Sequence, residues 1–364
     1  MKKSDIVRII LFLTVYLGIL FVFKNNAFHY RFDKKLINKY FLSQDIPYEV
    51  AGKRLFLSDD QIHIASGYLY VKGVNPIDYN FQHPPFIKYL FGLSILFFNN
   101  PFYAQITLGA ILIILTYYLG KKLFDSYIIS SAACFLLIID PLFMDISTSA
   151  LLDLGQAVCL LTYMISMLFF PKKTWLQGLT LGLLLTSKFW GGSVFFIGLI
   201  FIYLFYKKQL NIKKYLTHLL IAFFIICAVY VKTFINLHGR FNIIFFELKT
   251  LKYWFHHSIA SNFGSFMIMF LTGFYKSWWG KKEILRVFSW SFLWPISLIA
   301  SLYYGAKSLL KKKINVQFLI SILPFAYLVY LGFQAPFPRY FIVILPFCYL
   351  ILSQIIYKFI EKII

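Results

Sequence analysis

Ten apolar runs, each about as long as a membrane-crossing helix, follow one another along the 364-residue chain. Roughly 20 consecutive apolar residues form a helix that spans the hydrocarbon core of a bilayer. Inside a bilayer the backbone has to satisfy its own hydrogen bonds, so such runs fold as helices. The runs cover residues 6–23, 104–120, 126–143, 150–170, 175–188, 190–206, 215–231, 287–304, 316–333 and 339–357. The sequence therefore predicts an all-α polytopic membrane protein with about ten transmembrane helices.

The composition agrees with a membrane protein and argues against a soluble one. Hydrophobic residues make up 60% of the chain and charged residues 14%, far from the balance of a soluble domain. The formal net charge of +22 comes from Lys and Arg in short clusters between the runs. This spacing favours topology signals and anionic lipid headgroups over nucleic acid as the reason for the charge. The four cysteines lie in or beside apolar runs without CxxC spacing, so neither a disulfide framework nor a zinc site is indicated.

The basic clusters also predict which side of the membrane each loop faces, because short cytoplasmic loops are enriched in Lys and Arg. The clusters comprise Lys121 and Lys122, Lys172 and Lys173, Lys207 and Lys208, Lys213 and Lys214, Lys307 with Lys311–Lys313, and Lys358 with Lys362. If residues 1–5 are cytoplasmic and each run crosses once, all these clusters and both termini face the cytoplasm. The same count places residues 24–103 and 232–286 outside, as two large extracytoplasmic loops of a single membrane domain over residues 1–364.

The first outer loop contains two predicted surface helices. Residues 62–73, IHIASGYLYVKG, form a short amphipathic helix, and residues 84–98, PPFIKYLFGLSILFF, are too few to cross and lie along the membrane. Pro84 and Pro85 suit the first turn of a helix, where a missing N–H is no loss. In the second outer loop, residues 263–275 are interpreted as an interfacial or re-entrant helix. The first loop is therefore predicted to be a platform of surface helices.

Only fourteen residues are acidic, so each can be considered by its position. Four at the ends of runs are interpreted as ordinary interfacial charges, namely Asp5, Asp125, Glu283 and Glu361. Six lie on or near the predicted outer face, namely Asp59, Asp60, Asp140, Asp145, Asp153 and Glu247. Asp153 is the most informative, because it stands at the entrance of an apolar helix, where an ionisable group is costly. Its alternative is a helix-start carboxylate favoured by the helix dipole, and the alternative for Asp140, which precedes Pro141, is a helix-ending residue.

Basic residues on the predicted outer face are also few. Lys188 lies in LLLTSKFWGG between two apolar runs, Arg339 opens the last run, and His83 begins the His-Pro-Pro stretch. Together these three side chains suit a cationic site for a lipid-linked phosphate, since Arg makes bidentate contacts with phosphate. The alternative for Lys188 and Arg339 is that each side chain extends to the lipid headgroups.

Five stretches, taken in order, resemble the GT-C class of membrane glycosyltransferases, in particular the protein O-mannosyltransferase group. They are DDQIHIASGYLYVKG (59–73), FQHPPFIKYLFGLSILFF (81–98), IIDPLFMDISTSALLD (138–153), LTLGLLLTSKFWGG (179–192) and PFPRYFIVILP (336–346). The resemblance covers most of the chain up to about residue 192 and returns at the C-terminus. The family usually has Asp-Glu where this chain has Asp59 and Asp60. It often has an Arg before the second acid, where this chain has Ser147 to Ala150, and this difference concerns part of the phosphate site.

The resemblance implies a GT-C-like fold and an inverting transfer of a sugar, with mannose expected, from a polyprenyl-phosphate (dolichyl-phosphate) donor. The expected acceptor is a protein Ser or Thr hydroxyl on the extracytoplasmic face. Asp59 is then the base, with Asp60 supporting it or exchanging roles with it. The donor phosphate is expected to bind His83, Lys188 and Arg339. The two remaining acids, Asp153 and Asp140, are expected to orient Lys188, the acceptor or a metal.

No cofactor is required by this scheme, because cationic side chains can neutralise a single departing phosphate; a divalent cation remains an alternative. Transfer to a lipid or glycan acceptor also stays open, since acceptor specificity would lie in the outer loops. A transporter or flippase would use Asp140 and Asp153 as a coupling pathway, but transporters commonly have repeated halves with broken helices, and the sequence has no repeat of that kind. A structural membrane subunit is the third alternative. The one-sided cluster of acids favours surface chemistry, with membrane lipids and not nucleic acid as partners.

Overall fold

The computed structural model describes residues 3–46, 52–257, 262–277, 281–332 and 334–363. The described residues are mostly helical and contain one two-stranded antiparallel sheet, β1 (Phe274–Lys276) with β2 (Ile284–Arg286). The helices are α1 (Lys3–Phe23), α2 (Asn25–His29), α3 (Lys35–Phe41), α4 (Asp59–Val71), α5 (Phe86–Phe98), α6 (Phe102–Phe124), α7 (Tyr127–Ile138), α8 (Pro141–Ile146), α9 (Leu152–Phe169), α10 (Thr174–Ser187), α11 (Trp190–Tyr206), α12 (Ile212–Val229), α13 (Val231–Asn236), α14 (Ile243–His257), α15 (Ser265–Thr272), α16 (Leu293–Leu310), α17 (Val316–Leu331), the 3-10 helix η1 (Pro338–Val343) and α18 (Leu345–Ile363).

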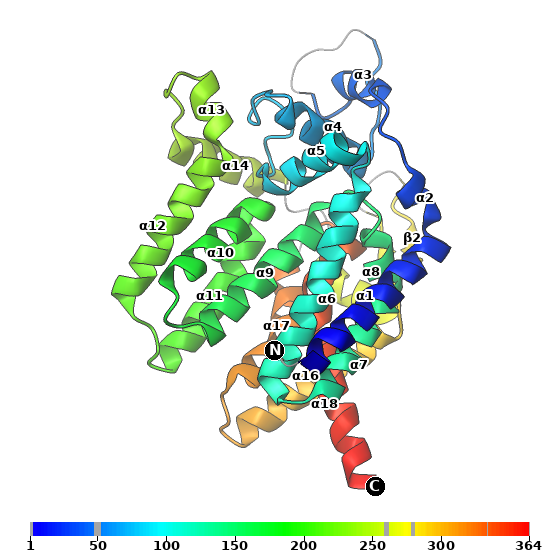
Figure 1. The fold of residues 1–364 in the computed structure, drawn as a ribbon, viewed down its shortest axis with the longest axis vertical. Coiled ribbons are helices and arrows are strands. Elements are labelled where there is room, and N and C mark those ends of the chain that lie inside the picture. The colour runs from blue at the N-terminus through cyan, green and yellow to red at the C-terminus, as the bar shows by residue number, and fades with distance from the viewer. Residues whose placement is uncertain (1–2, 47–51, 258–261, 278–280, 333, 364) are drawn as a thin grey trace.

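The long helices form one bundle, and several shorter helices gather at one end of it (Figure 1). That end carries α3, α4, α5, α13 and α14, and we call it the surface-helix end; both chain termini lie toward the opposite, terminal end. The turns that join α11 to α12 and α16 to α17 also lie at the terminal end. These turns contain Lys207 and Lys208 and the cluster Lys311–Lys313. These two basic clusters and both termini thus lie toward the same end of the bundle, and the side of the membrane that this end faces stays a prediction.

Four described helices are long and apolar enough to cross a membrane, namely α1, α6, α9 and α12. Further apolar helices are shorter, and α7 has only 12 residues. An α-helix rises 1.5 Å per residue, so α7 is about 18 Å long, well under the roughly 30 Å hydrocarbon core. The protein is therefore a mostly helical integral membrane protein, and the count of ten crossings remains a prediction.

Two of the predicted runs are not single helices. The run 126–143 divides into α7 and α8, because Pro141 has no N–H to continue the ladder and Asp140 caps α8 by accepting a hydrogen bond from the Phe143 N–H at 3.1 Å. The run 339–357 starts as the 3-10 helix η1 and becomes α-helical only at Leu345. Pro346 there would disrupt a continuous α-helix. The two breaks put Asp140 at a helix start and Arg339 in a 3-10 turn.

Asp140 connects three elements inside the bundle. Its side chain is fully buried, and Oδ2 accepts hydrogen bonds from the Trp294 indole of α16 at 2.8 Å and the Tyr349 hydroxyl of α18 at 2.5 Å. With the Phe143 N–H, three donors therefore surround the carboxylate, as a buried polar group requires. Asp140 begins a helix and does not end one, and its contacts hold α8 against α16 and α18.

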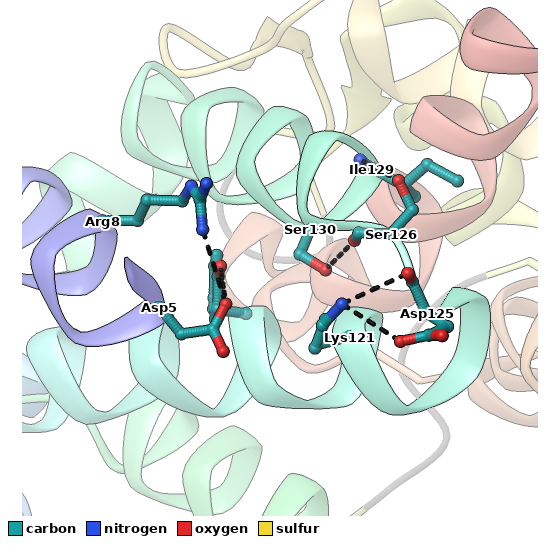
Figure 2. A network of polar contacts seen from close by, with 8 residues as sticks. Asp5, Arg8, Lys121, Asp125, Ser126, Ile129 and Ser130 are labelled. Carbon is teal, nitrogen blue, oxygen red and sulfur yellow. Dashed lines mark hydrogen bonds and ion pairs between the residues drawn. The ribbon is translucent and has the colours of Figure 1, made fainter. Parts of the chain in front are cut away.

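At the terminal end, polar contacts fasten the start of α1 to the end of α6 (Figure 2). Asp5 is buried there, so it is not the ordinary interfacial charge that its position in the sequence predicts. Its Oδ1 accepts a hydrogen bond from the Tyr117 hydroxyl at 2.9 Å and lies 3.5 Å from Arg8 Nη1. Nearby, Lys121 Nζ pairs with Asp125 Oδ1 at 3.0 Å and closes the last turn of α6. Because α1 packs on α6, these contacts fix the first helix of the bundle.

The two predicted surface helices of the first outer loop are both present, as α4 and α5, and they cross at glycines. A Cβ atom added at Gly92 of α5 would overlap the carbonyl oxygen of Gly67 in α4, and one added at Gly67 would overlap the carbonyl oxygen of Lys88. The neighbours are backbone atoms, which cannot rotate away as a side chain can. Below the crossing, Ile87 of α5 packs where a Cβ at Gly155 of α9 would lie. Small residues therefore set how closely the platform sits on the bundle.

Replacing Gly92 by Ala is expected to lower the melting temperature of the detergent-purified protein, because overpacking of this kind costs about 1–3 kcal/mol. Gly198→Ala in α11 is the matched control, since a Cβ there meets nothing within 4 Å, and Ala in a helix is favoured over Gly by about 1 kcal/mol. Thermal unfolding followed by intrinsic fluorescence compares the two. Equal melting temperatures would show that α4 and α5 are not in backbone contact.

Candidate active site

Four of the predicted site residues meet where the surface helices join the bundle. Asp59 is the first residue of α4, Asp153 is the second residue of α9, Lys188 directly follows α10, and Arg339 lies in η1. Lys188 Nζ lies 2.5 Å from Asp153 Oδ1, and Arg339 Nη1 lies 2.6 Å from Asp59 Oδ2. Arg339 Nε is 3.5 Å from Asp153 Oδ2, so the guanidinium bridges the two carboxylates. These four residues, up to 280 positions apart in the sequence, form one network of ion pairs, which we call the charge cluster.

The burial of these side chains decreases from the bundle outward. Asp153 is 2% exposed, Lys188 12%, Arg339 19% and Asp59 47%. A buried carboxylate without a partner would cost several kcal/mol, and two cations from different elements neutralise this one. The ring of Tyr340 covers Lys188, whose Nζ is 3.8 Å from the ring centroid. Asp59 is thus the member of the cluster that an incoming molecule can reach, and Asp153 is the member that anchors it.

The start of α4 separates the two adjacent aspartates. Ser58 precedes the helix, and its N–H donates to the Gln61 side-chain oxygen at 3.2 Å, as in a helix capping box. The Ser58 hydroxyl donates to Asp60 Oδ1 at 2.5 Å. Asp60 is therefore engaged at the helix cap, while Asp59 turns to Arg339. The geometry distinguishes two residues that the sequence leaves equivalent.

His83 lies beside the charge cluster, next to a second histidine that the sequence analysis did not single out. The ring of His83 lies 6.2 Å from that of His63 and 5.2 Å from that of Trp254. His63 is buried, and its Nδ1 is 2.9 Å from the carbonyl oxygen of Ala150, just before α9. His63 follows Asp59 by four residues, a spacing that places two side chains on one face of a helix. This spacing is the sequence signal by which His63 could have been predicted as a site residue.

The electrostatics keep Asp59 charged and both histidines neutral at pH 7. Burial raises the pKa of the Asp59 carboxyl, but the positive charges around it, Arg339 first among them, lower the pKa by more, so it lies below its usual value. Burial lowers the pKa of His63 to about 4, although Asp59 acts to raise it. Burial also lowers the pKa of His83 well below its usual value, and the neighbouring imidazole and cations lower it further. The resting site therefore offers an ionised carboxylate and two uncharged imidazoles.

Aromatic residues from a distant part of the chain border the site, and no local sequence signal predicts them. Trp254 of α14 stacks on Phe189 with ring centroids 5.0 Å apart, and its indole N–H donates to the Gln82 carbonyl oxygen at 2.9 Å. Next to it, the Trp190 indole donates to Glu247 Oε2 at 2.9 Å. Glu247, one of the acids predicted near the outer face, thus fastens α14 to the start of α11.

The other predicted residues lie elsewhere. Within the described residues, no hydrogen bond or ion pair joins Asp140 to the cluster, and its own donors come from α8, α16 and α18. Asp145 pairs with Lys24 Nζ at 2.6 Å and connects α8 to the end of α1. Nor do three or more His, Cys, Asp or Glu side chains converge as a metal site in the described part of the chain.

Two solved structures have a fold similar to that of this chain. The chain superposes on ArnT from Cupriavidus metallidurans bound to undecaprenyl phosphate with a TM-score of 0.59 and 12% sequence identity, over 88% of this chain and 58% of that one. The apo state of the same protein gives a TM-score of 0.58 and 13% identity, over 87% and 57% of the two chains. This chain thus spans less than two thirds of the length of ArnT. No protein-family model and no curated sequence matches it. The protein therefore has an ArnT-like fold.

The stability of the folded protein is expected to fall as the pH is lowered from about 6.5 toward 4. The pKa of His63 is lowered to about 4 in the folded state, so the unfolded chain, with a His pKa near 6.5, takes up the proton first. Each pH unit in this window costs about 1.4 kcal/mol per such histidine, and the pKa of His83 is lowered in the same direction.

Melting temperatures at pH 7 and pH 5 measure this dependence. His63→Gln keeps a hydrogen-bond donor for Ala150 and is expected to show a smaller decrease than the wild type. His29→Gln, at an exposed position, is expected to keep the full decrease. If the decrease in His63→Gln matched that of the wild type, burial of the neutral imidazole would not be its cause.

Proposed function

We propose that the protein transfers a sugar from a polyprenyl-phosphate carrier to an acceptor hydroxyl at its surface-helix end, which faces away from the cytoplasm. The observation that carries the proposal is the charge cluster of Asp59, Arg339, Asp153 and Lys188, which lies where the surface helices meet the bundle. The fold shared with a structure bound to undecaprenyl phosphate supports a donor of this kind. A lipid-linked donor reaches its site from the bilayer, so a site at this junction suits it.

The phosphate of the donor is proposed to bind Arg339, Lys188 and His83. Among the described residues, neither Arg339 Nε nor His83 Nδ1 has a hydrogen-bond partner, and both atoms are buried. An unsatisfied buried polar atom costs about 1–3 kcal/mol, which a ligand can recover. The guanidinium carries five N–H donors in a planar fork that matches phosphate oxygens. A guanidinium nitrogen and an imidazole nitrogen that lack hydrogen bonds, together with the Lys188 ammonium, suit an anion such as phosphate.

In the proposed reaction, the acceptor oxygen attacks the anomeric carbon of the sugar as the bond from that carbon to the phosphate oxygen breaks. The electron pair of the broken bond stays on the phosphate, and the acceptor proton moves to the Asp59 carboxylate. Attack opposite the departing phosphate inverts the anomeric carbon. A positioned base typically contributes about 10²–10⁴-fold to such a step. Asp60, held at the helix cap by Ser58, supports the start of α4, and Asp153 orients Lys188. A divalent cation stays an alternative to the cationic side chains.

The carrier chain is proposed to lie in a shallow apolar groove of about 530 Å³ between the platform and the bundle. Phe86, Tyr89 and Leu93 of α5 line one side, and Leu183 of α10 and Ile225 of α12 line the other. Phe86 is the first residue of α5 and lies three residues after His83, so the groove starts close in sequence to a proposed phosphate ligand. Apolar burial of about 25 cal/mol per Å² favours a hydrocarbon chain there.

Mannose as the sugar and a protein Ser or Thr hydroxyl as the acceptor are the finer parts of the proposal. They are supported by the resemblance of the sequence to protein O-mannosyltransferases. A lipid acceptor is the second candidate. It is favoured by the same groove, whose lining is apolar apart from Lys232 and the hydroxyls of Tyr70 and Tyr89. An anionic lipid would suit that lysine.

Asp59→Asn is expected to lower kcat for sugar transfer by about 10²–10⁴-fold, because the amide cannot accept the proton. Asp60→Asn keeps an oxygen for the Ser58 hydroxyl and is expected to lose less than about tenfold. The assay follows labelled sugar from polyprenyl phosphate in membranes that contain the full chain. Label in the protein fraction supports a protein acceptor, and label in the organic extract supports a lipid acceptor. Full activity in both variants would contradict the mechanism.

Leu93→Trp is expected to raise KM for the polyprenyl-phosphate donor roughly tenfold with kcat little changed, since a bulky ring in the groove removes binding that is equal in the ground and transition states. Ile10→Trp, at an exposed position on α1 away from the groove, is the matched control. Initial rates over a range of donor concentrations separate the two constants. An unchanged KM in Leu93→Trp would place the carrier chain outside the groove.

A further inference from the structure

Lys88, in the first turn of α5, is completely buried although it is a lysine. Its ammonium has four oxygen neighbours. Nζ lies 2.8 Å from the carbonyl oxygens of Asn80 and His83, 3.0 Å from Asn80 Oδ1 and 3.2 Å from the Tyr70 hydroxyl. Among the described residues no carboxylate lies within ion-pair distance of it, so its direct partners are all uncharged oxygens. Burial lowers the pKa of Lys88 to about 7, although Asp45 acts to raise it.

Burying a charge without a counter-ion is expensive, and packing alone gives no reason for it. Three of the four oxygens belong to the loop before α5, at Asn80 and His83. Asn80 has φ +46°, a left-handed conformation that few residues other than Gly adopt. The ammonium therefore holds together a loop whose backbone is folded around it.

A second set of contacts holds the same loop from outside. Asp45 Oδ1 accepts hydrogen bonds from the Asn80 side chain at 2.9 Å and the Gln82 side chain at 3.0 Å, and its Oδ2 accepts one from the Tyr40 hydroxyl at 2.6 Å. Trp254 donates to the Gln82 carbonyl oxygen at 2.9 Å. Pro84 and Pro85 follow and contribute no N–H. Lys88 thus holds the backbone carbonyl of His83, while the imidazole ring of His83 lies beside the charge cluster.

We propose that Lys88 is a positioning residue: by binding the carbonyl oxygens of Asn80 and His83, its ammonium fixes the loop 79–83 and so sets where the His83 imidazole stands. The inference rests on the proposed function for the role of His83 at the donor phosphate. Lys88 itself touches no substrate. Without its donors, three buried loop oxygens lose their partner, and they are then satisfied only if the loop moves toward water.

The test compares Lys88→Met, which keeps the length of the side chain and removes its donors, with Lys72→Met at an exposed position on the same platform. Hydrogen–deuterium exchange of the full chain in detergent is expected to be faster across residues 79–83 in Lys88→Met and unchanged in Lys72→Met. Asn80→Ala, which removes one of the four oxygens together with the hydrogen bond to Asp45, is the second variant if Lys88→Met folds poorly. Unchanged exchange across 79–83 in these variants would overturn the proposal whatever the protein catalyses.

Binding of undecaprenyl phosphate tests whether the loop acts through His83. His83→Ala and Lys88→Met are each expected to raise its Kd about tenfold, and the double variant is expected to raise it no further, because residues that act as one unit are not additive. A double variant weakened by the product of both factors would overturn the coupling. If His83→Ala bound normally, the proposed phosphate role of His83 would fail, and the exchange result would still decide whether Lys88 anchors the loop.

Discussion

The arrangement of the site depends on one buried carboxylate, Asp153. It is 2% exposed at the start of an apolar helix, where a lone charge could not be tolerated. Its two oxygens face Lys188 at the end of α10 and Arg339 in η1, so three elements that are distant in sequence must converge on it. The break before α18 belongs to the same constraint. A continuous helix from residue 339 would place the guanidinium differently, whereas η1 brings it across both Asp153 and Asp59.

The position of the platform follows from α9 as well. Ile87 of α5 packs onto Gly155, two residues after the buried carboxylate, and α5 carries α4 through the crossing of Gly67 with Gly92. Asp59 is therefore held relative to Asp153 by two glycine contacts and one guanidinium. The His63 contact to the Ala150 carbonyl oxygen adds a fourth connection between α4 and the segment before α9. Contacts with α9 and the segment before it therefore position both the accessible Asp59 and the buried Asp153 of the charge cluster.

Properties that depend on local sequence could be predicted, and those that depend on long-range packing could not. The apolar runs, the surface helices α4 and α5 and the candidates Asp59, Asp153, Lys188 and Arg339 follow from composition, spacing and resemblance. The different surroundings of Asp59 and Asp60 depend on the cap at Ser58, and the interior position of Asp140 depends on Trp294, 154 residues later. The stacking of Trp254 on Phe189 and the burial of Lys88 have no local signature, because an isolated lysine on a short helix normally extends to water.

On the proposed function, the charge cluster couples proton uptake by the base to departure of the phosphate. In the resting site the carboxylates of Asp59 and Asp153 balance Lys188 and Arg339, with Arg339 shared between both acids. As the acceptor proton reaches Asp59, that carboxylate becomes neutral and its hold on the guanidinium weakens. At the same moment the departing phosphate gains negative charge beside Arg339. Because interactions that strengthen only in the transition state accelerate the step, a cation released by protonation of the base stabilises the leaving group when it is needed. Asp153 keeps that cation in reach throughout, and this is a reason for a carboxylate so deep in the protein.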